Sequence, residues 1–471
     1  MSHEICWMSA IEIAEAVRSK QLSPLEVVDA VLAQIDRSNP EVNAIVTRTD
    51  ELARAQARAA EQSVLRGEEL GPLHGVPISV KDLEETKGIR TTFGSKLYEH
   101  YVPETDHVIV ERLRQAGAIL IGKTNTPEFG LLPLTDNNVF GPTRNPWNLE
   151  HNAGGSSGGA AAAVACGMGP LATGSDGGGS IRIPSSMCGV FGIKPHLGRA
   201  ANHHFQPGWE SLSCVGPIGR SVRDAARMLD VISGPSAADR WSLPASADSF
   251  EEACGQDVRG LRLAWSPDLG HVPVEPEVRE ACEEAVRRIE KLGCSVSEVS
   301  LELEDLSWVL QTIVICETVA AMDDQREEWE RVMFEPLRAF IVMGEQFSYK
   351  DLLRAHWRRE EFVRELAPLF EEYDALLTPQ LSVTAPRNGT MGPDEINGQA
   401  VSPLGWLGFT FPFNLTGQPA ASIPIGFDQG DLPIGLQLAG RRFGEATLLR
   451  LASAYEAAYP WATRRPPVAG A

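Results

Sequence analysis

The chain contains 471 residues, of which 43% are hydrophobic and 22% are charged, a composition that is typical of a globular protein and excludes a largely disordered one. Its formal net charge is -21, and no cluster of Lys and Arg offers an attractive surface, so we expect neither nucleic acid nor a membrane as a partner. The N-terminal residues do not resemble a secretory signal and no apolar run is long enough to cross a bilayer, which predicts a cytoplasmic protein.

The cysteines are scattered along the chain and form no CxxC pair with histidines at zinc spacing. We therefore expect reduced, mostly buried thiols and no metal site. The eight positions are Cys6, Cys166, Cys188, Cys214, Cys254, Cys282, Cys294 and Cys316.

Residues 9–67 have apolar side chains at three- and four-residue spacing, which predicts helices. Ser23, directly before Pro24, is typical of a helix N-cap with proline in the first turn. The first part of the chain is therefore expected to form a helical layer, with a possible role as a subunit contact.

Strand and helix patterns alternate after this layer. Apolar residues alternate with others over 76–80, a helix is expected over 107–116, and an apolar run at 118–121 predicts a second strand. This alternation indicates an α/β sheet with helices on its faces.

Glycine, serine and alanine dominate residues 141–195. Residues 160–166 are expected to form a tightly packed helix, whereas the glycine runs at 154–159 and 174–179 are predicted to be loops without regular structure. The remaining expected elements are helices at 221–232 and 276–292, a helical subdomain over 301–372, strands at 376–379, 420–425 and 436–440, and a closing helix at 445–459.

These elements predict one α/β domain over 1–471, with a mixed, twisted β-sheet core covered by helices on both faces. Within it, we expect a helical layer over 1–70, a catalytic core over 71–235, and a variable helical and loop insert over 300–410 that shapes a substrate pocket.

Lys81, Ser156 and Ser180 are the candidate catalytic residues. Each alone is more typical of an ordinary surface lysine or loop serine. Together they suggest acyl transfer, because glycine-rich loops expose N–H groups and let a carbonyl approach a serine closely. N–H groups of Gly177, Gly178 and Gly179 could hold the developing oxyanion, at roughly 3–4 kcal/mol per donor.

Four segments carry a specific resemblance: GVPISVKD with Lys81, GGSSGG with Ser156, GSDGGGSIRIP with Ser180, and FGIKP at 191–195. They resemble the amidase-signature family, and the resemblance extends over nearly the whole chain. It implies the family's fold, with Ser180 as nucleophile, Ser156 as a proton relay held by a cis peptide, and Lys81 as a neutral general base. Burial of Lys81 would disfavour its ammonium form, which such a base requires.

Ser157, Asp176 and Arg182 are expected to support the site, the last two as an ion pair or hydrogen-bonded frame for the nucleophile loop. The chain also departs from the family pattern. Gly177 stands where Thr or a β-branched residue is common, His151 where Arg is common, and His196 where Thr usually follows Lys-Pro. The first departure affects the expected geometry of the oxyanion loop.

The resemblance implies cleavage of the C–N bond of a small-molecule amide or carbamate, with ester cleavage as a side activity and with no cofactor. The monomer or a homodimer would suffice for this reaction. The expected substrate-binding residues are Glu128, Phe129, Gly130, Leu131 and Leu132. Aromatic residues of the insert could either join this wall or pack in the core, namely Trp308, Trp406 and Phe409.

Other functions remain open. Gly155-x-Ser157-x-Gly159 fits the nucleophile elbow of an α/β-hydrolase, but no apolar strand precedes it. Phosphate binding by the loops lacks a matching motif, and a ligand-binding protein without activity would have no chemical reason to keep the three catalytic residues. A glutamine-hydrolysing amidotransferase subunit is the main rival, although residues 197–215 resemble free-standing amidases more.

Overall fold

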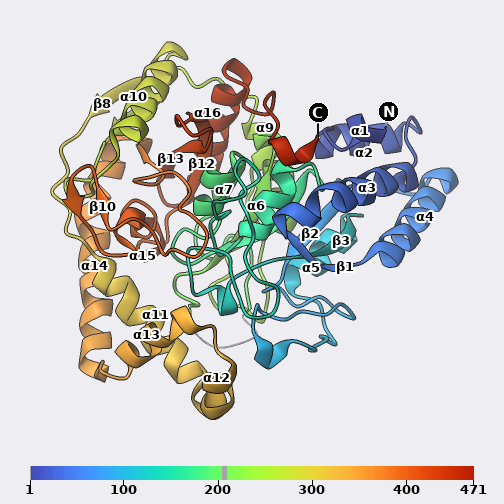
Figure 1. The fold of residues 1–471 in the computed structure, drawn as a ribbon. Coiled ribbons are helices and arrows are strands. Elements are labelled where there is room, and N and C mark those ends of the chain that lie inside the picture. Colours follow the sequence, from blue (N-terminus) through green and yellow to red (C-terminus); the bar gives the residue numbers. More distant parts are fainter. Residues whose placement is uncertain (1, 204–208, 471) are drawn as a thin grey trace.

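The computed structural model describes residues 2–203 and 209–470, so part of the segment 197–215 lies outside the described residues. Within these ranges, an 11-stranded mixed sheet runs through the whole molecule (Figure 1). Its strands, in spatial order, are β1 (Ile45–Arg48), β3 (Ile119–Thr124), β2 (Pro77–Lys81), β4 (Leu171–Asp176), β6 (Cys214–Gly219), β5 (Phe191–Lys194), β12 (Ala420–Phe427), β13 (Pro433–Gly440), β9 (Ala375–Pro379), β7 (Arg262–Trp265) and β8 (Ser295–Glu298). The short strands β10 (Glu395–Ile396) and β11 (Gln399–Ala400) form a separate pair.

Helices pack on both faces of the sheet, as predicted. One face carries α3 (Pro24–Val42), α6 (Gly158–Ala165) and α7 (Arg182–Cys188). The other carries α5 (Val108–Gln115), α8 (Val222–Ile232), α10 (Pro276–Lys291) and α16 (Glu445–Ala458). The N-terminal part adds α1 (Ser2–Ile5), α2 (Ala10–Arg18) and α4 (Asp50–Arg66). Two further helices are only one turn long, namely α9 (Phe250–Ala253) and α15 (Pro412–Leu415).

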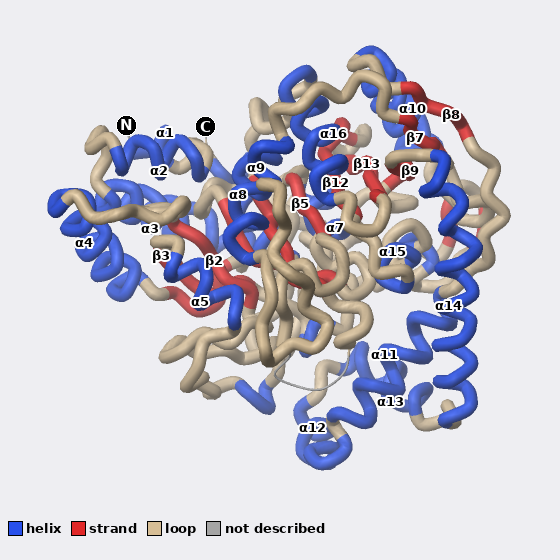
Figure 2. Tube along the Cα trace, turned by 180° about the vertical axis from the view of Figure 1, so that it is seen from behind, coloured by secondary structure: helices blue, strands red, loops and turns tan. Residues whose placement is uncertain are grey.

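The insert forms a helical lobe at the end of the molecule away from the two termini (Figures 1 and 2). It contains α11 (Ser307–Ala321), α12 (Arg326–Val332), α13 (Glu335–Gly344) and α14 (Tyr349–Glu372). The two termini lie together at the opposite end, where the Gln34 side-chain amide donates to the main-chain oxygen of Ala469 at 2.9 Å. Within the described residues, no helix has the length and apolar character needed to cross a bilayer.

Several local predictions are confirmed. Ser23 caps α3 and its hydroxyl accepts from the N–H of Leu25, with Pro24 in the first turn. The helices expected at 107–116 and 445–459 are α5 and α16, within one or two residues at each end. Each of the eight cysteines is free within the described residues, and all except Cys316 are buried.

The prediction that 154–159 and 174–179 contain no regular structure was partly wrong. Gly158 and Gly159 begin α6, and Gly174 to Asp176 complete β4. Strand β4 pairs with β6 over its whole length and with β2 at its start, so neighbouring strands satisfy its backbone groups despite the glycine. The edge strand β1 was also missed within the predicted helical layer.

Candidate active site

Lys81 is the last residue of β2, and its side chain is completely buried. Its main-chain N–H donates to Thr173 Oγ1 in the neighbouring strand β4 at 2.8 Å, which fixes the end of the strand. Its Nζ donates to Ser156 Oγ at 2.8 Å and to Ser175 Oγ at 2.9 Å. The lysine side chain is therefore directed at two serine hydroxyls from different segments.

Burial lowers the pKa of Lys81 to about 7, although the nearby carboxylates of Glu84 and Asp176 act in the opposite direction. An ammonium group without a paired carboxylate is disfavoured in a buried site. A large fraction of Lys81 is therefore neutral near pH 7, and a neutral amine can accept a proton from a hydroxyl group.

Ser156 follows a cis peptide bond from Gly155, and its side chain is buried beside Lys81. The next residue, Ser157, lies at the start of α6, and its N–H donates to the main-chain oxygen of Ser180 at 3.1 Å. Its hydroxyl interacts with main-chain groups of Ser175. Ser157 thus connects the loop of Ser156 to the loop of Ser180 by hydrogen bonds.

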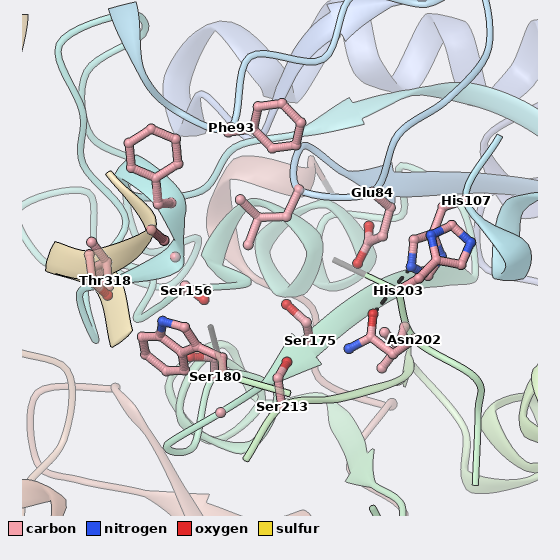
Figure 3. Close-up of a pocket in the computed structure, with 18 of the residues that line it drawn as sticks. Glu84, Phe93, His107, Ser156, Ser175, Ser180, Asn202, His203, Ser213 and Thr318 are labelled. Carbon is pink, nitrogen blue, oxygen red and sulfur yellow. Dashed lines mark hydrogen bonds between the residues drawn. The ribbon is translucent and has the colours of Figure 1, made fainter. Parts of the chain in front are cut away.

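Ser180 lies just before α7 and borders the same cavity as Ser156 and Ser175, as Figure 3 shows. The hydrogen bonds of the described residues include none between the hydroxyls of Ser180 and Ser156. Catalytic hydrogen bonds are often long before substrate binds, so the shared cavity and the Lys81–Ser156 bond are the relevant geometry.

Asp176 and Arg182 form a completely buried ion pair, with Arg182 Nη2 and Asp176 Oδ1 2.9 Å apart. Burial alone would raise the pKa of Asp176, but the Arg182 guanidinium holds this pKa well below its usual range. Asp176 also accepts from the N–H of Gly179 at 2.8 Å and of Ile181 at 3.1 Å, so the carboxylate shapes the loop that carries Ser180.

The three predicted oxyanion donors differ in whether their N–H groups already have a hydrogen-bond acceptor. The N–H of Gly179 is engaged by Asp176, whereas the N–H groups of Gly177 and Gly178 have no acceptor among the described residues. The Trp209 ring lies against Gly177, where a Cβ atom would be 2.4 Å from ring atom Cε3. A side chain at position 177 would therefore require the Trp209 ring to move.

Two cavities meet at Ser180, and both are bordered by Gly130, Leu131, Trp209 and Thr318. The cavity that we name the polar chamber is lined on its far side by Glu84, Ser175, His107, Asn202, His203 and Ser213. The apolar chamber is lined by Leu132, Leu310, Val314, Leu337, Phe340 and Ile341, mostly from α11 and α13. In Figure 3, Thr318 and His203 lie on opposite sides of the view, with Ser156, Ser175, Ser180 and Ser213 between them.

The predicted substrate-binding loop lies at this junction, with one exception. Phe129, Gly130, Leu131 and Leu132 border one or both chambers. Glu128 lines neither chamber in the described part of the chain, because its carboxylate accepts from Ser95 Oγ, Trp329 Nε1 and the N–H of Phe334. It joins the loop to the helical lobe.

The three aromatic candidates of the insert do not line either chamber within the described residues. Trp406 and Phe409 are completely buried in hydrophobic clusters, in agreement with the core interpretation. Trp308 is 41% exposed and borders a separate surface depression.

Other site residues could not be picked out from the sequence. Two of them had a sequence signal, because Ser175 lies within one of the motifs and Glu84 lies two residues after another. Trp209 and His203 come from a region without a motif, and the contact of Thr318 depends on how α11 packs. Among the described residues, no group of three His, Cys, Asp or Glu side chains is arranged to hold a metal ion.

The chain is similar to known proteins over nearly its whole length. Residues 26–449 match the family described as Amidase. An acylamidase of Rhodococcus erythropolis is 40% identical over 98% of this chain and 97% of its own length. A glutamyl-tRNA(Gln) amidotransferase subunit of Carboxydothermus hydrogenoformans is 37% identical over 96% of this chain and 97% of its own length. A crystal structure of a bacterial aryl acylamidase has a TM-score of 0.93 and 35% identity, and the match covers 99% of both chains.

Proposed function

This chain belongs to the Amidase family, and we propose that it is a serine hydrolase that cleaves the C–N bond of small-molecule linear amides through an acyl-enzyme on Ser180. The observation that carries the proposal is the contact of buried Lys81 Nζ with Ser156 Oγ, in the same cavity as Ser180. The similarity to an acylamidase supports it.

In the proposed mechanism, Ser180 Oγ attacks the carbonyl carbon while its proton passes to Ser156 Oγ and the Ser156 proton passes to neutral Lys81 Nζ. The N–H groups of Gly177 and Gly178 hold the negative oxygen of the tetrahedral intermediate. A proton then returns from Lys81 through Ser156 to the nitrogen as the C–N bond breaks. A water molecule then attacks the acyl-enzyme and loses a proton through Ser156 to Lys81. The proton returns along the same route to Ser180 Oγ as the carboxylic acid leaves.

Carbamates and esters present the same carbonyl to Ser180, so we include urethane cleavage and a side esterase activity in the proposal. The free cysteines support a reducing compartment such as the cytoplasm. We propose that the protein acts without a partner protein, as a monomer or homodimer.

The amidotransferase subunit is the second candidate, because such proteins are similar over nearly the whole chain. The chamber walls favour the free-standing amidase. The described lining of both chambers contains no Lys or Arg, so the α-carboxylate of glutamine would find no cation there. The α/β-hydrolase alternative is disfavoured because the Ser157 hydroxyl interacts with the Ser175 backbone and is buried.

The test compares wild type with Ser180→Ala on a 4-nitroanilide, an aryl carbamate, an aryl ester and glutamine, with the protein alone in solution. We expect release of nitroaniline by wild type, none by the variant, and no ammonia from glutamine. If the protein alone released ammonia from glutamine and spared the anilide, the amidotransferase function would replace this proposal.

A further inference from the structure

Glu84 is a buried acid at the edge of the catalytic centre that the proposed mechanism does not use. It follows Lys81 by three residues, and only 3% of its surface is exposed. Its Oε2 accepts from Thr173 Oγ1 at 2.9 Å. Its Oε1 has no hydrogen-bond partner in the described structure. Figure 3 shows the carboxyl group directed into the polar chamber, on the side of Ser175 and His203.

No Lys or Arg of the described residues donates a hydrogen bond to the Glu84 carboxylate, although the charges of Lys81 and Lys123 favour its ionised form. Lys123 Nζ donates to the main-chain oxygen of Glu84 and to the hydroxyls of Thr86 and Thr91, not to the carboxylate. Lys81 Nζ is directed at two serines. A buried acceptor without a partner is costly, so its place in a cavity beside the nucleophile indicates that a group entering the cavity satisfies it.

The two chambers determine which group that is. A carbonyl carbon at Ser180 has two substituents, and the chambers leave Ser180 in two directions. The substituent in the apolar chamber meets Leu310, Val314 and other apolar side chains. The substituent in the polar chamber can extend towards Glu84. While Glu84 is ionised, its free oxygen accepts hydrogen bonds and cannot donate one.

We propose that Glu84 is a specificity-determining residue, and that its Oε1 accepts a hydrogen bond from an amine or hydroxyl on the substrate substituent in the polar chamber. The inference rests on the proposed amidase function and refines its substrate class. The preferred substrates are amides with an apolar group on one side of the carbonyl and a donor-bearing group on the other.

Burial raises the pKa of Glu84 to about 7, against the effect of the nearby lysines. Above this pH the carboxylate is the main form and accepts from the donor, so the preference should be measured at about pH 8.5. A bound water could also satisfy Oε1, and Glu84 could act only through Lys81. The experiment separates these roles from substrate recognition.

The experiment uses two pairs of substrates in which an amino group replaces a methyl group of similar size. The first pair is the hexanoyl amides of 4-aminoaniline and 4-methylaniline, with the donor on the amine side. The second is the anilides of 4-aminobenzoic and 4-methylbenzoic acid, with the donor on the acyl side. The measured quantity is the ratio of kcat/KM for the amino and methyl members, determined by chromatography of the products.

The ratio is compared between wild type, Glu84→Leu and Asp82→Asn. Intrinsic reactivity and the amount of active enzyme cancel, because each ratio is measured within one protein and compared between proteins. Asp82 is the matched control, since it is a buried acid next to Lys81 that accepts from Thr92 and lines neither chamber in the described residues. If Glu84→Leu does not fold, Glu84→Gln replaces it.

We expect Glu84→Leu to lower the ratio by about 10-fold or more in one pair, which identifies the half of the substrate in the polar chamber. Glu84→Gln should lower it by at least about threefold, because the acceptor loses its charge. Asp82→Asn should leave the ratio unchanged.

Equal loss on both members of both pairs would overturn the inference, since Glu84 would then act only through Lys81 or a bound water. An unchanged ratio with unchanged rates would overturn it as well. If wild type cleaved none of the four amides, both the proposed function and the inference would fail. If wild type cleaved them and the Glu84 variants kept the same ratio, only the inference would fail.

Discussion

The protonation state of Lys81 leads to a quantitative prediction for the pH dependence of kcat/KM. Lys81 must be neutral to accept a proton, and burial lowers its pKa to about 7. Because the pKa is lowered, the neutral form dominates above pH 7 and is lost as the pH falls. The neutral fraction is about one half at pH 7, about one tenth at pH 6 and about one hundredth at pH 5. We therefore expect kcat/KM to fall about tenfold per pH unit below pH 6.

The assay is release of nitroaniline from an acyl 4-nitroanilide between pH 5 and 10, with each sample returned to pH 8 to confirm that the enzyme has not unfolded. Glu84→Gln tests the electrostatic origin of the effect. The Glu84 carboxylate favours the ammonium form of Lys81, so its removal should move the acidic limb to lower pH. Glu128→Gln is the control, because Glu128 is buried in contact with Ser95 and Trp329 instead.

The charges of Lys81 and Glu84 influence each other, so the apparent pKa of the acidic limb in the wild type describes the two groups together. In Glu84→Gln the limb reports the pKa of Lys81 without this partner. A profile that stayed flat down to pH 5 would refute Lys81 as the base, and so would near wild-type activity in Lys81→Ala. A limb close to the ordinary lysine value of about 10.4 would show that burial does not act on Lys81 as the structure indicates.

Three further predictions concern the nucleophile, its frame and the chamber wall. Ser180→Ala should lower kcat by at least about 10³-fold and leave binding of an acyl anilide measurable by calorimetry, because the acyl-enzyme cannot form. Arg182→Met leaves a buried carboxylate unpaired and should cost about 3–5 kcal/mol in urea unfolding, whereas Arg387→Met, at an ion pair with both side chains more than 60% exposed, should cost about 0–1 kcal/mol. Gly177→Ala places a Cβ 2.4 Å from the indole ring of Trp209, which borders both chambers, and should change the preference for acyl chain length. Gly426→Ala is the control, because its Cβ meets no atom within 4 Å and Gly426 borders neither chamber in the described residues. Equal preferences in the two variants would contradict this prediction.

The fold could largely be predicted from sequence because its signals are local, whereas the proposed roles of Lys81, Ser156 and Ser180 came from the resemblance of their motifs to a family. The strand before Lys81 has alternating apolar residues, and the glycine runs around Ser156 and Ser180 predict loops that a ligand can approach closely. Strand β4 was not predicted at Gly174 because its pairing partners, β2 and β6, lie far away in sequence. Local composition does not report such pairing.

The loop residues Phe129 to Leu132 were predicted in the chamber walls, but the residues that α11 and α13 contribute were not, because they depend on how these helices pack. Leu310, Val314 and Thr318 recur every four residues on α11 and share the face that lines the site. Trp308 lies two residues from Leu310, on a different face of the helix, and is exposed. The aromatic residue Trp308 was predicted as a candidate wall residue, but the orientation of α11 places Leu310 and Val314 in the wall instead.

The division between the proposed reacting groups and the chamber walls also bears on how relatives are interpreted. Lys81, Ser156 and Ser180 come from the sheet and the buried segments around α6 and α7, which form the core of the fold. The wall of the apolar chamber comes largely from α11 and α13, and Trp209 borders both chambers. Substitutions in the walls can therefore redirect the substrate while acyl transfer is preserved. An acylamidase with 40% identity and an amidotransferase subunit with 37% identity are almost equally similar to this chain, so overall identity does not separate the two activities. Chamber residues such as Glu84 and Leu310, rather than overall identity, should discriminate between the two activities.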